Sequence, residues 1–205
     1  MENGSLMQNI KAIYQKYGFF PNDIERMSLW GEEPTLTLDS FCIMFPELRK
    51  FFPNLEELFF STNGIANTTR ILQLIDCINN TLNEKDNFTL DLQFSYDGKW
   101  ATNFNRGVNP TIIENNIKYF INELNKRTLK DNFKIVYTFH FVVDLNVINH
   151  VYEEVNGVYN YYKELYDFQK QFKELTINKN VISHGISEGI IAPYNATKEE
   201  GILFA

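Results

Sequence analysis

The sequence predicts an α/β fold in which short strands alternate with longer helices around a parallel sheet. Five short apolar runs, rich in β-branched and aromatic residues, are separated by segments whose apolar residues recur with the period of a helix. These helical segments are roughly 10–16 residues long, which suits the crossover between two parallel strands. Periodicity alone leaves a closed barrel and an open sheet as alternatives.

The predicted strands differ in how clearly the sequence marks them. Residues 133–143 give the longest signal, and residues 88–94 alternate apolar with polar side chains as a half-buried strand does. The other predicted strands are 24–30, 55–60 and 175–182.

The predicted helices are marked by apolar periodicity and by residues that cap helix ends. Asn109 and Pro110 form an N-cap followed by proline at the first helical position. Pro46 requires a kink or a break in the second helix. The predicted helices cover residues 6–17, 37–52, 68–82, 110–124 and much of 147–172.

Composition excludes several classes of protein. The chain has 205 residues, 44% of them hydrophobic, and a formal net charge of −7, which argues against a partner that is nucleic acid. It contains no apolar run of the roughly 18–20 residues that a membrane span needs, and its first residues do not form a signal peptide. We therefore expect a cytoplasmic protein with no membrane partner.

Small polar residues follow three consecutive predicted strands. The turns read GEEP at residues 31–34, STNG at 61–64 and SYDG at 95–98. Each turn by itself contains ordinary turn-forming residues. Because the carboxyl ends of parallel strands lie at one edge of a sheet, we expect the three turns to share one rim, where ligands bind in such folds.

The same three turns, in this order, carry a family resemblance. LWGEEPTL at residues 29–36, STNG at 61–64 and FSYDG at 94–98 resemble the radical S-adenosylmethionine superfamily, along the whole chain. The resemblance implies a partial (β/α)6 TIM-like barrel that lacks its first strand and its cluster loop. It implies S-adenosylmethionine as the cofactor, with a 4Fe–4S cluster in the parent protein.

The resemblance also implies a set of cofactor-binding residues. The first turn would hold the ammonium group of the cofactor, the second its ribose and methionine, and the third its ribose. Asp97 would either hold its turn or reach that ribose, and Arg106 would bind the methionine carboxylate. The full set is Gly31, Glu32, Glu33, Pro34, Ser61, Thr62, Asn63, Ser95, Asp97 and Arg106.

The chain departs from this family at its defining feature. It has no Cys-x-x-x-Cys-x-x-Cys motif, and its two cysteines, Cys42 and Cys77, cannot provide three thiolates. Both lie on apolar faces of predicted helices, where a free cysteine is usually a small hydrophobic residue. We therefore expect no metal ligands in this chain. A smaller departure is Glu32, which stands where a second glycine is usual.

Truncation would explain the missing motif. We expect residues 1–205 to be a single radical-SAM-like domain, cut at both ends, because the first helix resembles the one that follows the cluster loop. A capping box at residues 197–200 predicts the start of a helix, and the sequence ends about two turns later. The rival explanation is a degenerate homologue that has lost the cluster.

Three functions follow from these alternatives. The parent would cleave S-adenosylmethionine reductively and abstract a hydrogen from a substrate, such as a peptide or protein, and this chain alone would be inactive. A cluster-less homologue would serve as a binding or scaffold subunit. An unrelated βα enzyme would be favoured if Glu33, Asn63 and Ser95 did not converge on one rim.

Other polar and aromatic residues carry weaker signals. His140 lies on the strongest predicted strand and either faces the sheet interior near a ligand or is a satisfied core histidine. Asp144, at the end of that strand, is placed for substrate contact. The tyrosine-rich segment 159–168 is either a helix packing face or a binding surface. No catalytic residue is identified.

Overall fold

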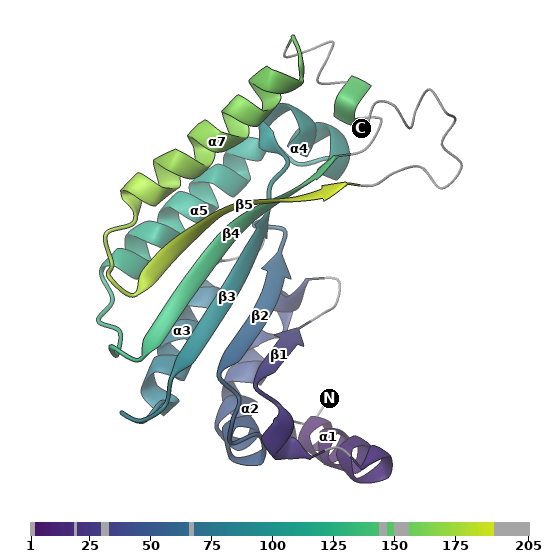
Figure 1. Ribbon diagram of the computed structural model, residues 1–205, viewed down its shortest axis with the longest axis vertical. Helices are drawn as coiled ribbons and strands as arrows, with labels where there is room; N and C mark the ends of the chain where they lie inside the picture. Colours follow the sequence, from purple (N-terminus) through teal and green to yellow (C-terminus); the bar gives the residue numbers. More distant parts are fainter. Residues whose placement is uncertain are drawn as a thin grey trace.

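The computed structural model describes residues 3–18, 20–29, 33–65, 68–143, 147–149 and 156–190. Within them lies a five-stranded parallel sheet with helices packed against it (Figure 1). The capping box at residues 197–200 falls outside the described residues. The strands are β1 (Arg26–Leu29), β2 (Glu57–Thr62), β3 (Phe88–Ser95), β4 (Phe133–Val143) and β5 (Val181–Ile190).

Helices connect the strands. The first, α1 (Asn3–Tyr17), precedes β1 and packs against α2 (Leu38–Phe51) through an edge-to-face contact between Tyr14 and Phe51. Two short 3₁₀ helices, η1 (Pro21–Asp23) and η2 (Pro34–Leu36), flank β1. The α-helices are α1 (Asn3–Tyr17), α2 (Leu38–Phe51), α3 (Thr68–Thr81), α4 (Gly98–Arg106), α5 (Pro110–Asn125) and α7 (Val158–Leu175).

The strands are ordered in the sheet as they are in the sequence, β1-β2-β3-β4-β5, and every pair is parallel. Their carboxyl ends therefore lie at one edge, as the arrowheads in Figure 1 show. The predicted α/β fold with a parallel sheet is confirmed.

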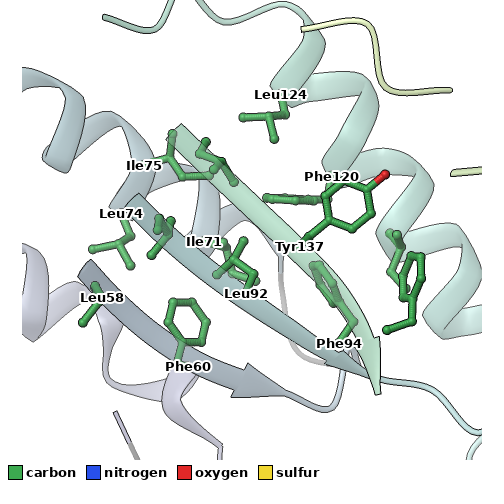
Figure 2. Packing of buried hydrophobic residues seen from close by; sticks show 14 of the residues in the cluster. Leu58, Phe60, Ile71, Leu74, Ile75, Leu92, Phe94, Phe120, Leu124 and Tyr137 are labelled. Atoms are coloured by element: carbon green, nitrogen blue, oxygen red, sulfur yellow. The ribbon is translucent and has the colours of Figure 1, made fainter. Parts of the chain in front are cut away.

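The core lies between the sheet and the helices on one of its faces. Along β2, β3 and β4, buried residues alternate with partly exposed ones. Figure 2 shows Phe60 of β2 and Leu92 and Phe94 of β3 on the side of Ile71 from α3 and Phe120 from α5. All five side chains are at most 1% exposed. The other residues of each strand form the opposite, more polar face, which we call the open face.

The last strand differs from its prediction. The sequence predicts a strand at residues 175–182, but α7 continues to Leu175 and β5 begins at Val181. Leu175 belongs to the helix because its side chain packs against the core on the helical period. The strand itself contains Gly185 and Gly189 and has a register shift beside Tyr137 and Thr138. This composition and this irregularity hide the period-two pattern of a strand.

Of the kink or break predicted at Pro46, the break is absent. The helix α2 runs from Leu38 to Phe51 without a break, although proline cannot donate to the carbonyl four residues earlier. That carbonyl belongs to Cys42. It accepts a hydrogen bond from the thiol of Cys77 in α3, with a distance of 3.2 Å from Sγ to the carbonyl oxygen. A side chain of the neighbouring helix thus replaces the missing backbone donor.

The helix α4 was not predicted at all. It begins at Gly98, whose φ of +86° lies in the left-handed region, and it ends at Arg106. A Cβ atom at Gly98 would lie 3.2 Å from the ring of Tyr161 in α7. Glycine therefore permits both the turn into α4 and its close approach to α7.

Among the residues that the structure describes, no helix combines the length and the apolar character needed to cross a membrane.

The contact between Cys77 and the Cys42 carbonyl generates a prediction about stability. Replacing Cys77 by alanine leaves that carbonyl without a donor, which we expect to cost about 1 kcal/mol of unfolding free energy. The cost should largely disappear in a Pro46→Ala background, because residue 46 then donates its own amide. Urea denaturation of the two single variants and the double variant measures the coupling. Equal costs of Cys77→Ala in both backgrounds would contradict it, and Cys77→Ser, which keeps a donor, is the control.

Candidate functional site

The candidate site lies at the carboxyl edge of the sheet and on the adjoining part of the open face. The turns that follow β1, β2 and β3 meet at this edge because the three strands are parallel neighbours. Gly31 and Glu32 of the first turn, and Asp144 after β4, fall outside the described residues. The description of the site therefore starts at Glu33.

The carboxylate of Glu33 joins the first two turns. Its Oε1 accepts hydrogen bonds from the hydroxyl of Thr62 at 2.8 Å and from the hydroxyl of Thr35 at 2.7 Å. Its Oε2 accepts from the backbone N–H of Asn63 at 2.9 Å. Glu33 also caps η2, which starts at the buried Pro34, by accepting from the N–H of Thr35. One half-buried side chain therefore fixes the end of β2 to the segment that follows β1.

The turn after β2 is held by its own side chains. The hydroxyl of Thr62 accepts from the N–H of Gly64 at 3.3 Å, and the amide oxygen of Asn63 accepts from the N–H of Ile65 at 2.9 Å. Gly64 has a φ of +67°, and a Cβ there would lie 2.9 Å from a methyl carbon of Ile113. Only glycine fits this position, and the backbone of α5 can therefore approach the rim closely.

Ser61 and Ser95 place two hydroxyls side by side. Their Oγ atoms are 3.4 Å apart, and both residues belong to the partly exposed row of their strands. Both lie at or next to the carboxyl end of a strand. Together with the link between Glu33 and Asn63, this contact brings residues of all three sequence motifs to one rim. The convergence that the sequence predicts is present.

A line of polar side chains extends this pair across the open face. Ser95 is paired in register with His140 on β4, and His140 with Ser187 on β5. The Nδ1 atom of His140 is 3.0 Å from the hydroxyl oxygen of Ser187, which also accepts from the Gln93 side-chain amide at 3.4 Å. A Cβ at Gly189 would lie 3.1 Å from Nε2 of His140, so this glycine leaves room for the ring.

Burial lowers the pKa of His140 from its ordinary value. The first cause is desolvation; the charge of Asp97 opposes it and the charge of Arg106 adds to it. A neutral imidazole at pH 7 fits the hydrogen bonds, since Ser187 receives a donor from Gln93 and is left to donate its own proton to Nδ1. Nε2 then carries the ring proton and is a hydrogen-bond donor on the open face.

Asp97 and Arg106 form a bidentate ion pair behind the rim. Arg106 Nε donates to one carboxylate oxygen at 2.6 Å and Nη2 to the other at 3.0 Å. Asp97 is fully buried, and it also accepts from the N–H of Val142 at 2.9 Å. Its backbone carbonyl accepts from the hydroxyl of Tyr161 at 2.7 Å. The pair therefore joins the end of β3 to β4, α4 and α7.

This arrangement bears on the roles that the sequence left open. The Asp97 carboxylate contacts Arg106 and the amide of Val142, and its role toward a ribose stays a prediction. Arg106 is the last residue of α4, and its Nε and Nη2 atoms are bound to Asp97.

Two members of the polar line were missed by sequence reasoning. Gln93 alternates with Ser95 along β3, so the strand pattern could have placed both on one face. Ser187 lies beyond the predicted end of the last strand, so its position was hidden by the error in β5.

The cysteines lie away from this rim. Cys42 and Cys77 are in α2 and α3, where both are half-buried and pack against the core. Among the described residues, no group of three or more histidine, cysteine or acidic side chains is arranged to hold a metal ion. The residues present therefore do not fit a 4Fe–4S cluster, which needs three thiolates besides its substrate ligand.

The role of Glu33 can be tested by Glu33→Gln. The amide replaces one acceptor oxygen by a donor that faces other donors, so we expect a loss of about 1–2 kcal/mol of unfolding free energy. Urea denaturation measures it. Glu47→Gln, at an exposed position on α2, is the matched control and should change stability by less than about 0.5 kcal/mol. A Glu33→Gln effect no larger than the control would remove Glu33 as the link between the turns.

The lowered pKa of His140 predicts a dependence of stability on pH. Below the ordinary value near 6.5 the unfolded chain binds a proton more readily than the folded chain, so unfolding free energy should fall as pH decreases from about 7 to about 5. His140→Gln should flatten this slope. An NMR titration of the His140 ring should give a pKa below 6.5, and a value at or above 6.5 would contradict the neutral imidazole.

A comparison of this chain with protein-family models, with curated proteins and with solved structures gives no significant match.

Proposed function

We propose that this chain binds S-adenosylmethionine at the rim of its sheet, as a domain of the radical S-adenosylmethionine type. The observation that carries the proposal is the hydrogen bond from the N–H of Asn63 to Glu33. It joins two of the three motifs that resemble this superfamily, and the contact of Ser61 with Ser95 adds the third. Parallel neighbours bring such turns to one edge in any α/β sheet, and here side-chain hydrogen bonds also join them.

The sheet supports the barrel form of the proposal. In a βα barrel each strand lies beside the strand before it and the helices cover the outer face. The order β1 to β5 follows the sequence, and α3, α5 and α7 lie on one face (Figure 1). A doubly wound fold instead reverses its strand order and has helices on both faces. We therefore propose that the sheet is an open segment of a barrel whose interior is the open face.

The rim residues offer groups that suit the cofactor. Glu33 Oε2 accepts one hydrogen bond here, and a carboxylate oxygen has room for another donor such as an ammonium group. The hydroxyls of Ser61 and Ser95 suit ribose hydroxyls. Arg106 Nη1 suits a carboxylate, with Asp97 holding the guanidinium in place.

The chemistry that the cofactor supplies in this superfamily is hydrogen abstraction after reductive cleavage, and it requires an iron–sulfur cluster. Because Cys42 and Cys77 do not fit a cluster, the proposal for this chain is limited to binding the cofactor and presenting a substrate. A peptide or protein substrate remains part of the proposal. The position of both cysteines in the helical layer also favours a second candidate, a cluster-less binding or scaffold subunit.

Anaerobic reconstitution of this chain tests the assignment of its cysteines, and the same experiment on a longer form separates the two candidates. The chain is incubated with iron and sulfide, and iron is measured before and after desalting. A stoichiometric cluster would contradict our assignment of the two cysteines. Cofactor binding without iron would support both candidates. A requirement for a longer, cluster-bearing form would favour the enzyme.

Cofactor binding is tested by calorimetric titration with S-adenosylhomocysteine, which has no reactive sulfonium. We expect saturable binding that weakens about tenfold in the Ser61→Ala/Ser95→Ala double variant, because two hydrogen bonds to the ribose are lost. Thr89→Ala, on the same face of β3 but at its amino end, is the matched control and should bind S-adenosylhomocysteine as tightly as the unsubstituted chain does. No binding, or equal loss in the control, would contradict the proposed site.

A further inference from the structure

Two thiols meet in the helical layer, away from the rim. Cys77 in α3 contacts Cys42 in α2, with its sulfur 3.2 Å from the Cys42 carbonyl oxygen. Both residues are half-buried, and neither is fully enclosed in the core. The sequence separates the two residues by more than two helical turns and a whole strand, and it does not predict this contact.

The contact brings the side chain of Cys77 against residue Cys42, which a disulfide between them would need. A disulfide forms when two Cα atoms are about 4.4–6.8 Å apart and the Cβ atoms point towards each other. Here the side chain of Cys77 reaches the backbone of Cys42. Pro46 contributes to this approach, since it leaves the Cys42 carbonyl in need of a donor.

The two thiols differ in how readily they ionise. The hydrogen bond with Cys42 lowers the pKa of Cys77 to about 7, burial opposes this, and Thr81 adds to it. The same hydrogen bond raises the pKa of Cys42, as do burial and the charge of Asp39. A neutral Cys77 donates to the Cys42 carbonyl, and an ionised Cys77 accepts from the Cys42 thiol instead. Cys77 is therefore the thiol suited to attack.

We propose that Cys42 and Cys77 form a modification site that a small-molecule disulfide, such as oxidised glutathione, converts into an intramolecular disulfide. The Cys77 thiolate attacks one sulfur of the small disulfide, whose S–S bond breaks and releases one thiolate. The Cys42 thiol then loses its proton and attacks the Cys77 sulfur, which releases the second thiolate. Two protein thiols are oxidised and one small disulfide is reduced to two thiols.

Oxidation would change the packing of two helices. The new bond would tie α2 to α3, and it would remove the S–H group that donates to the Cys42 carbonyl. The site is independent of the proposed cofactor site, so it stands or fails on its own test.

The test is oxidation of the folded chain in glutathione buffers of defined composition. Intact mass spectrometry counts cross-linked chains, and digestion without reductant identifies the peptide that joins Cys42 to Cys77. We expect a monomer that loses two hydrogens and both alkylatable thiols. We compare the glutathione buffers in which half of the chains are cross-linked. For the folded chain this buffer should be at least about tenfold more reducing than for the chain denatured in about 6 M guanidinium chloride.

The single variants test the order of the two steps. In Cys42→Ser the remaining Cys77 should form a glutathione adduct about tenfold faster than Cys42 does in Cys77→Ser. Equal oxidation of folded and denatured chains, a disulfide-linked dimer, or glutathione adducts without the cross-link would each overturn the proposal. The comparison of the folded with the denatured unsubstituted chain does not depend on whether either variant folds.

Discussion

Each of the three central strands, β2, β3 and β4, buries one row of side chains against the helices and leaves the next row partly exposed, and the other features depend on this alternation. Because Phe60, Leu92 and Phe94 supply the apolar row, Ser61 and Ser95 are free to be polar. A parallel sheet covered on both faces would have required apolar residues in both rows. The polar character of the open face is therefore determined by the residues of the strands and not by those of the loops.

Two carboxylates hold the carboxyl edge of this sheet in shape. Glu33 accepts hydrogen bonds from the segments around β1 and β2, and Asp97 accepts from β4 and from Arg106 of α4. A carboxylate suits this role because it has several acceptor positions and needs no donor of its own. Backbone N–H groups at the ends of strands have no partner in the sheet, so acidic side chains stabilise the places where the ladder stops. The turns at the rim are consequently fixed relative to one another before any ligand arrives.

Sequence patterns predicted the elements whose signals are local, and they failed where the signal is spread over the fold. The helix at Pro110 and the strand 133–143 carry strong signals and were found. The start of β5 was wrong because its glycines and its register shift obscure the alternation. The contact between Glu33 and Asn63 followed from the parallel arrangement alone. The contact between Cys42 and Cys77 depends on how two helices pack, which no local pattern records.

The order of the strands also has a consequence for how the chain folds. Each of β2 to β5 pairs with the strand that was synthesised about 30–50 residues earlier, so the described sheet can grow at one edge as the chain lengthens. No strand has to enter between two neighbours that have already paired. Each new helix covers the apolar row of the newest strand as it forms, which limits the time that this row meets water. The order of the described strands across the sheet is therefore the order in which they are synthesised.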